Sequence, residues 1–111
     1  MLELTQDQID QLRQTEHEAF VGRVRDELAA KYPDMKADGR LTARLLAAHR
    51  AALALGLQSP EARTQFLYQE SFAPSFYQQP AIVAWLTKEG AHPERRWKDF
   101  VAYATAKMEA M

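Results

Sequence analysis

The segment 66–80 constrains the fold of this chain more than any other part of the sequence. It places five aromatic residues and two prolines in fifteen positions. Each proline lacks a backbone N–H and favours extended geometry at the residue before it, so one continuous helix cannot run through the segment. We therefore expect an ordered aromatic connection between helices. Its rings at Phe72, Phe76 and Tyr77 are large enough to clamp neighbouring helices together or to line a groove.

The composition fits one small globular domain. The chain has 111 residues, of which 47% are hydrophobic and 26% are charged. This length supports one hydrophobic core and is too short for two independent ones, so we predict a single domain over residues 1–111. The formal net charge of −1 provides no general attraction to nucleic acid or to an anionic membrane.

The chain shows no signal that would direct it to a membrane or out of the cell. Its first ten residues lack the basic start and apolar run of a secretory signal, and no apolar stretch approaches the ~20 residues of a membrane span. There is no cysteine, which excludes disulfides and thiolate chemistry and fits a reducing compartment. These features predict a cytoplasmic protein without a membrane partner.

Signals for helix ends predict five helices and no strands. Thr5 with Gln8 has the pattern of a capping box, Ser59 is the expected N-cap of a helix that begins at Pro60, and Gly56 is expected to stop the preceding helix. The predicted helices cover about 5–31, 40–55, 60–73, 80–89 and 93 onward. We therefore predict an all-α fold, a compact bundle of about five helices, with a polar loop over 34–40.

Apolar residues recur at helical spacing on each predicted helix. The central helix, 40–55, carries the most regular stripe, with leucines and alanines at steps of three and four. On the first helix the expected packing face comprises Ile9, Leu12, Phe20, Val24, Leu28 and Tyr32. Glu16 interrupts this pattern. We expect one face to pack and the rest of the helix to be charged.

The histidines do not form a metal-binding pattern. His17 lies between Glu16 and Glu18, but neighbours in sequence point about 100° apart on a helix, so these three side chains cannot converge on one ion. There is no HExxH motif. We expect His49 to be a partly buried histidine that donates to a backbone carbonyl. The sequence therefore predicts no metal site and no cofactor.

Catalytic patterns are also missing from the sequence. Ser59 is explained as a helix cap, and Ser75 lies in the aromatic connection without a GxSxG context. The glycines are isolated, so there is no phosphate-binding loop. Glu70 lies close to the aromatic connection, where burial could raise its pKa, but an ion pair with a nearby arginine is the preferred interpretation. We predict a protein that is not an enzyme.

Two of the predicted helices have the proportions of a helix-turn-helix. They cover 40–56 and 60–73, and the second offers Arg63, Thr64 and Gln65 near its start, which are side chains able to read bases. The overall charge argues against this interpretation, which is kept as an alternative. Nucleic acid is accordingly not the predicted partner.

Aromatic residues leave protein binding as the best-supported function. Tyrosine and tryptophan are enriched in the energetic centres of protein interfaces, and a domain of this size cannot enclose all of its rings. We predict a groove between the central helix and the aromatic connection, in a monomer or weak homodimer. The predicted contact residues are Tyr68, Phe76, Tyr77 and Trp85, with Arg44 and Arg50 at the rim.

Several motifs resemble those of short bacterial proteins encoded beside type VI secretion effectors and their spike-tip proteins. The resemblance covers nearly the whole chain. The motifs are Phe20-x-x-Arg23 leading to Leu28, Lys31-Tyr32-Pro33, Ala54-Leu55-Gly56-Leu57-x-Ser59, Phe66-Leu67-Tyr68, Pro74-x-Phe76 with Pro80, and Glu94-Arg95-Arg96. They are packing and capping motifs and carry no catalytic residue to transfer.

This resemblance implies an accessory role with a partner encoded nearby. The expected function is that of an adaptor or co-chaperone, which would use an apolar groove at the aromatic connection. The alternative is an immunity protein, which would meet a toxin with an acidic face. Residues 1–37 hold eight acids against five bases, and that face would comprise Asp7, Asp10, Glu16 and Glu18.

Overall fold

Seven helical elements make up the ordered secondary structure of the protein. The computed structural model describes residues 5–88, 90 and 92–109, and this part of the chain contains no strand. The elements are α1 (Gln6–Lys31), the 3-10 helix η1 (Pro33–Ala37), α2 (Leu41–Ala54), α3 (Pro60–Phe72), the 3-10 helix η2 (Phe76–Gln78), α4 (Pro80–Leu86) and α5 (Pro93–Glu109). The predicted all-α fold with five helices in one domain is confirmed.

The predicted capping residues set the helix ends. The Thr5 hydroxyl accepts from the Gln8 N–H at 3.1 Å, while the Gln8 side chain accepts from the Thr5 N–H at 2.8 Å. Ser59 Oγ accepts from the Ala62 N–H at 3.1 Å, which begins α3. Gly56 has a φ of 90° after α2, a conformation that strains any residue with a Cβ. The hydrogen bonds of Thr5, Gln8 and Ser59 provide acceptors for backbone N–H groups that the start of a helix leaves without partners.

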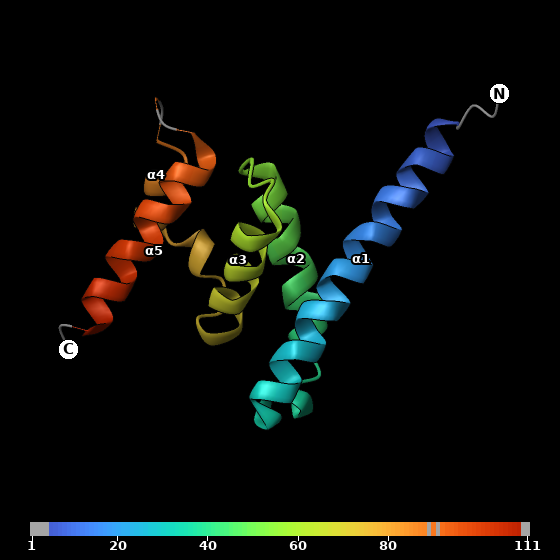
Figure 1. Ribbon diagram of the computed structural model, residues 1–111, viewed down its shortest axis with the longest axis horizontal. Helices are drawn as coiled ribbons and strands as arrows, with labels where there is room; N and C mark the ends of the chain where they lie inside the picture. The colour runs from blue at the N-terminus through green and yellow to red at the C-terminus, as the bar shows by residue number, and fades with distance from the viewer. Residues whose placement is uncertain (1–4, 89, 91, 110–111) are drawn as a thin grey trace.

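The helices form a row in the order α1, α2, α3 and α5, in which α1, α2 and α3 alternate in direction whereas α3 and α5 run the same way (Figure 1). Helix α2 packs between α1 and α3, and α5 packs against α3 and α4. Leu41, Leu45, Ala48 and Ala52 of the predicted α2 stripe are buried, because both sides of the helix meet a neighbour, whereas Leu53 is 46% exposed. The row is flat and wide, with extents of 58 × 41 × 21 Å.

Aromatic rings fill the core between α3, η2 and α5. The ring centroids of Phe66 and Phe76 lie 5.0 Å apart, and those of Phe66 and Trp97 lie 5.1 Å apart. Phe100 stacks on Phe76 with centroids 6.1 Å apart. All four rings are buried, so η2 is held against the two longer helices by apolar contact.

The N-terminal part of α1, residues 6–16, diverges from α2 and α3 (Figure 1). We call this segment the α1 arm. Buried side chains on α1 begin only at His17. Leu12 is 50% exposed and Tyr32 is 41% exposed, so the predicted packing face is not buried at these two positions. The arm diverges from α2, and none of its side chains is buried in the described chain.

The aromatic connection is present where the prolines predict it. Helix α3 ends at Phe72, η2 follows, and Pro80 begins α4. Ser75 has a φ of 60°, and its N–H donates to Glu70 Oε2 at 2.7 Å. The predicted polar loop over 34–40 is partly wrong, because Pro33 begins η1 there.

No helix in the described part of the chain combines the length and apolar composition needed to cross a bilayer.

Candidate functional site

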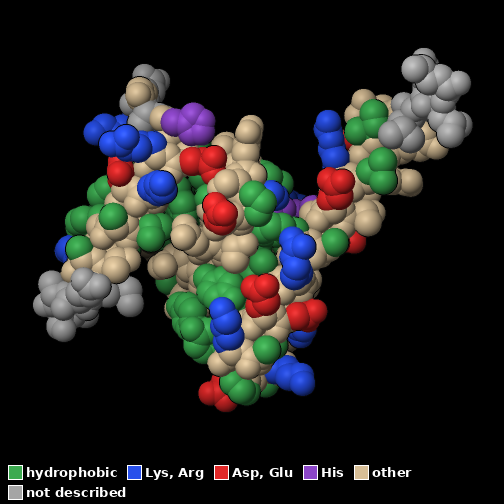
Figure 2. Space-filling view, in the orientation of Figure 1, with side chains coloured by type: hydrophobic (Ala, Val, Ile, Leu, Met, Phe, Trp, Pro, Cys, Tyr) green, Lys and Arg blue, Asp and Glu red, His purple; other side chains and the backbone are tan. Residues whose placement is uncertain are grey.

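A groove lined by aromatic residues runs along α3, between α1 on one side and α5 on the other. It has a volume of about 500 Å³. Hydrophobic side chains gather over this part of the surface, beside charged side chains from α1 (Figure 2). We call it the aromatic groove. Its lining residues are Glu27 and Lys31 of α1, Thr64, Gln65, Tyr68, Gln69 and Phe72 of α3, and Trp97 and Val101 of α5.

Phe72 is the most exposed aromatic side chain of the groove. The ring is 57% exposed, although a phenylalanine gains about 1.5–3 kcal/mol when it is fully buried. It packs edge-to-face with Tyr32, at the C-terminal end of α1, with ring centroids 5.0 Å apart. Two aromatic rings from different helices therefore stand open to solvent on one side of the groove.

Tyr68 joins the aromatic groove to its charged rim. The hydroxyl accepts from Lys31 Nζ at 3.2 Å and donates to Glu27 Oε2 at 3.3 Å. The hydrogen bond to Tyr68 raises the pKa of Lys31. The rim thus offers a lysine and a glutamate beside the exposed rings, as is common around protein interfaces.

Trp97 gives the groove a fixed wall. Its indole is buried, and Nε1–H donates to Gln65 Oε1 at 3.0 Å. This bond and the packing of Trp97 against Phe66 link α5 to α3, the two helices that carry most of the lining. A binding surface on packed helices is positioned more precisely than one on loops.

The groove predicted between the central helix and the aromatic connection is present as a smaller hollow of about 240 Å³. Alanine and leucine side chains of α2 form one wall, and Tyr77 lies on the other with residues of α4. Burial raises the pKa of Tyr77. Val83, which lines this hollow, is 40% exposed. Of the six predicted contact residues, only Tyr77 lines it.

The remaining predicted aromatic residues lie in three different places. Tyr68 lines the aromatic groove, and Trp85 lies in a hollow between α4 and α5, where its ring is 4.9 Å from that of Tyr103. Phe76 is only 4% exposed and packs in the core. The prediction of Phe76 as a direct contact residue is therefore wrong, because the connection turns this ring inward and Phe72 outward.

Arg44 is a structural residue in this fold. Its guanidinium lies 2.9 Å from Asp38 Oδ2 and 3.4 Å from Glu70 Oε1, and it donates to the Glu70 carbonyl oxygen at 2.6 Å. The preferred interpretation of Glu70, an ion pair with a nearby arginine, is confirmed. Because these partners occupy its donors, Arg44 ties α2 to the end of α3 and is not a free rim residue. Arg50 is exposed on α2 and lines neither hollow.

His49 does not donate to a backbone carbonyl as predicted. Its Nδ1 lies 2.6 Å from Nδ1 of His17, and its Nε2 lies 3.2 Å from a guanidinium nitrogen of Arg63. Burial lowers the pKa of His17. Burial, with His17 and Arg63 adding to it, lowers the pKa of His49 to about 4. Among the described residues, no three histidine, aspartate or glutamate side chains lie close enough together to hold a metal ion.

Two of the three side chains that could read bases are engaged inside the protein. Arg63 faces His49 and lies over the Phe20 ring at 4.6 Å, and Gln65 accepts from Trp97. These contacts give the nucleic-acid alternative less support than the aromatic groove gives to protein binding.

Glu94 links the start of α5 to the start of α3. Its Oε1 accepts from the Ser59 N–H at 3.0 Å, and hydrogen bonding to the side chain and then to the backbone of Ser59 lowers the pKa of Glu94. The contact explains Glu94 of the Glu94-Arg95-Arg96 motif as a packing residue.

Comparison with known proteins adds no relative: no family model matches the chain, and no curated protein and no solved structure matches it either.

Proposed function

We propose that this protein is a non-catalytic protein-binding module and that its partner contacts the aromatic groove. The observation that carries the proposal is the open pair of rings, Phe72 and Tyr32, on a groove between packed helices with a rim of both charges. Contiguous exposed apolar patches rimmed by polar residues often mark protein–protein contact sites. A helix or an extended segment of a partner that inserts one apolar side chain beside Phe72 would fit it.

The accessory role implied by the resemblance narrows the partner to a protein encoded nearby. We favour an adaptor or co-chaperone of a secretion effector over an immunity protein, because an apolar groove suits a chaperone-like contact. The acidic side chains Asp7, Asp10, Glu16 and Glu18 are exposed on α1, so the immunity alternative has a surface that can be tested separately.

Co-expression with each neighbouring gene product, followed by pull-down, tests the proposal. Phe72→Ala is expected to weaken the complex by at least about tenfold while leaving the melting temperature nearly unchanged, since the removed ring is largely exposed. Tyr103→Ala is the matched control, because Tyr103 is 47% exposed and lies outside the groove. We expect it to bind as the wild type does.

Three results would contradict this proposal or redirect it. If no neighbouring product binds, the partner assignment fails. If Phe72→Ala and Tyr103→Ala bind equally well, the aromatic groove is not the contact. If binding instead fails on Asp7→Lys or Glu18→Lys, the acidic face is the interface and the immunity alternative replaces the adaptor.

A further inference from the structure

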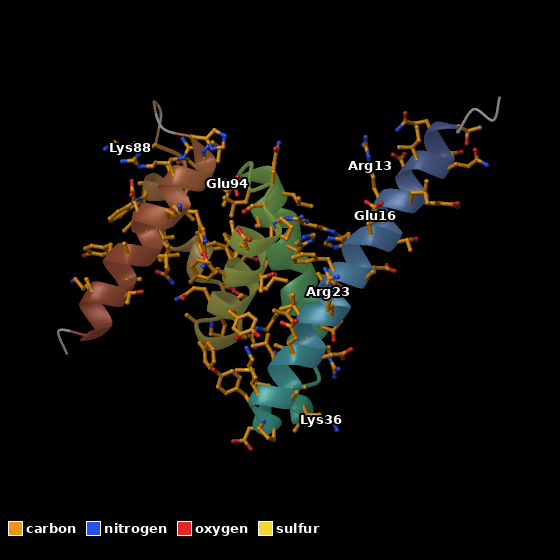
Figure 3. The ribbon with its side chains drawn as sticks, viewed as in Figure 1. Arg13, Glu16, Arg23, Lys36, Lys88 and Glu94 are labelled. Carbon is orange, nitrogen blue, oxygen red and sulfur yellow. The ribbon has the colours of Figure 1, made fainter. Side chains whose placement is uncertain are left out.

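A further hollow, of about 560 Å³, lies between α1, the C-terminal end of α2 and the N-terminal end of α3. We call it the arginine notch. Figure 3 shows three of its residues, Arg13, Glu16 and Arg23, spaced along α1 from the arm to the body of the bundle. The lining residues are Arg13, Glu16, Ala19, Phe20 and Arg23 of α1, Leu53 of α2 and Arg63 of α3.

The notch holds more positive charge than the described chain neutralises. Arg13, Arg23 and Arg63 have no salt bridge to any residue of the described part of the chain. The Nε of Arg63 is buried and has no hydrogen-bond partner there. Glu16 lies in the same notch but pairs with none of these arginines. Buried guanidinium donors normally have acceptors. Carboxylates from outside the described chain would therefore complete the hydrogen bonding of the notch.

The face of α1 that borders the notch continues onto the arm. Residues at steps of three and four lie on one side of a helix. Along this face they are Gln6, Ile9, Arg13, Glu16, Phe20 and Arg23. The face therefore carries a base and an acid side by side, with an apolar residue on each side of that pair. Such an order is complementary to itself when two copies run antiparallel.

We propose that the arginine notch is occupied by the α1 arm of a second copy of this chain, in a two-fold antiparallel dimer. In this arrangement Arg13 pairs with the partner's Glu16. The same register places Ile9 level with the partner's Phe20, whose buried ring is covered by the guanidinium groups of Arg23 and Arg63. A two-fold axis repeats each contact, so the central ion pair forms twice. Asp10, on the flank of this face nearer the bundle, then lies level with the partner's Arg63 and supplies the carboxylate that Arg63 lacks.

Exposed surface on the arm and around the notch supports a second copy as the occupant. Leu12 is 50% exposed and Leu53 is 46% exposed, and the dimer covers both. The chain exposes 7908 Å², whereas a monomer of its mass of 12.7 kDa typically exposes roughly 6,200 Å². A stable interface buries roughly 800 Å² per partner, which is within this excess.

Charge-swap variants test the dimer and its register. Sedimentation velocity of the wild type over a concentration series is expected to show a monomer–dimer equilibrium. Arg13→Glu and Glu16→Arg should each weaken the dimer by at least about tenfold, because each places two like-charged pairs at the centre. The double variant Arg13→Glu/Glu16→Arg restores opposite charges and should recover the dimer. Glu18→Arg is the matched control, since Glu18 lies on the other side of α1 and should have no effect.

A distance measurement tests the antiparallel orientation independently. The chain has no cysteine, so one spin label can be attached at Thr15→Cys, which is level with the two-fold axis but on the outer side of α1. We expect a shorter distance between these two labels than between labels at Thr105→Cys on α5. All four arm variants should keep the helical circular dichroism of the wild type, because the positions are exposed.

Several outcomes would overturn the dimer. One is a wild type that stays monomeric throughout the concentration series, and another is an Arg13→Glu variant that dimerises as the wild type does. A double variant that fails to recover would reject the Arg13–Glu16 register. A monomer that instead binds a poly-glutamate peptide or an oligonucleotide, and loses it on Arg13→Glu, would assign the notch to a different occupant.

Discussion

The Nδ1 atoms of His17 and His49 lie 2.6 Å apart in the interface between α1 and α2. One hydrogen must lie between nitrogens this close. Arg63 can only donate, so its contact makes His49 Nε2 an acceptor and places the hydrogen of His49 on Nδ1. His49 therefore donates to His17, whose own hydrogen is on the buried Nε2, an atom with no partner in the described chain. This arrangement holds only while both rings are neutral.

The first prediction is that mild acid destabilises the protein through this pair. The pKa of His49 is about 4 in the folded protein against 6.5 in the unfolded chain, so the unfolded chain binds its proton first as the pH falls. The stability that the neutral ring provides is present above pH 6.5 and is lost toward pH 4. Between pH 7 and pH 5 we expect the free energy of unfolding to fall by roughly 2 kcal/mol, measured by urea denaturation.

His92 and His49 variants separate this effect from general acid sensitivity. His92→Gln should keep the same pH dependence, because His92 is exposed. His49→Gln should be less stable at pH 7 but should lose most of the change between pH 7 and pH 5. A wild type whose stability is flat over this interval would contradict the prediction.

The second prediction concerns the ion pair between Arg44 and Glu70. Glu70 is 1% exposed, so Arg44→Met would leave a buried carboxylate whose one remaining hydrogen-bond donor is the backbone N–H of Ser75. We expect a loss of about 3–5 kcal/mol, measured by chemical denaturation. The double variant Arg44→Met/Glu70→Leu removes both charges and should lose clearly less than the sum of the two single variants. Additive losses would show that the pair is not coupled.

The third prediction contrasts two phenylalanines of the same segment. Phe76→Ala removes a core ring and should cost about 3–5 kcal/mol in the free energy of unfolding. Phe72→Ala removes a ring that is 57% exposed and should cost less than about 1 kcal/mol. Thermal and urea denaturation of the two variants, side by side, measure the difference. Equal losses would show that exposure does not distinguish the two rings.

Local signals in the sequence predicted the helices well. The Thr5 capping box, the Ser59 cap and the stop at Gly56 act between residues close in the chain, so one sequence contains all the information that they need. The burial of the α2 stripe was predictable for a similar reason, since a short helix with an apolar stripe and a central place in the chain has neighbours on both sides.

Contacts between distant residues could not be read in the same way. Helical spacing shows that Leu12 and Phe20 share a face, but it does not show that α2 reaches only one of them. The spacing of Phe72 and Phe76 likewise does not show which of the two rings points into the core. The turn at Ser75 decides this, because it lies between them. In the aromatic groove, Lys31 of α1 contacts Tyr68 of α3, although the two residues are 37 positions apart in the sequence. The Lys31-Tyr32-Pro33 and Phe66-Leu67-Tyr68 motifs were visible, but nothing in the sequence showed that they meet.

The last prediction is that Ser75→Gly stabilises the protein. Ser75 has a φ of 60°, in the left-handed region, where a Cβ costs roughly 1–2 kcal/mol and a glycine has no such cost. The N–H that donates to Glu70 is part of the backbone and is kept in the variant. The greater freedom of glycine in the unfolded chain offsets part of the gain, so we expect a net increase of about 0.5–1 kcal/mol in the free energy of unfolding. Ser75→Ala is the control and should give no increase, because alanine keeps the Cβ. If Ser75→Gly is instead less stable than the wild type, the Ser75 side chain contributes more to the turn than the strain of its backbone removes.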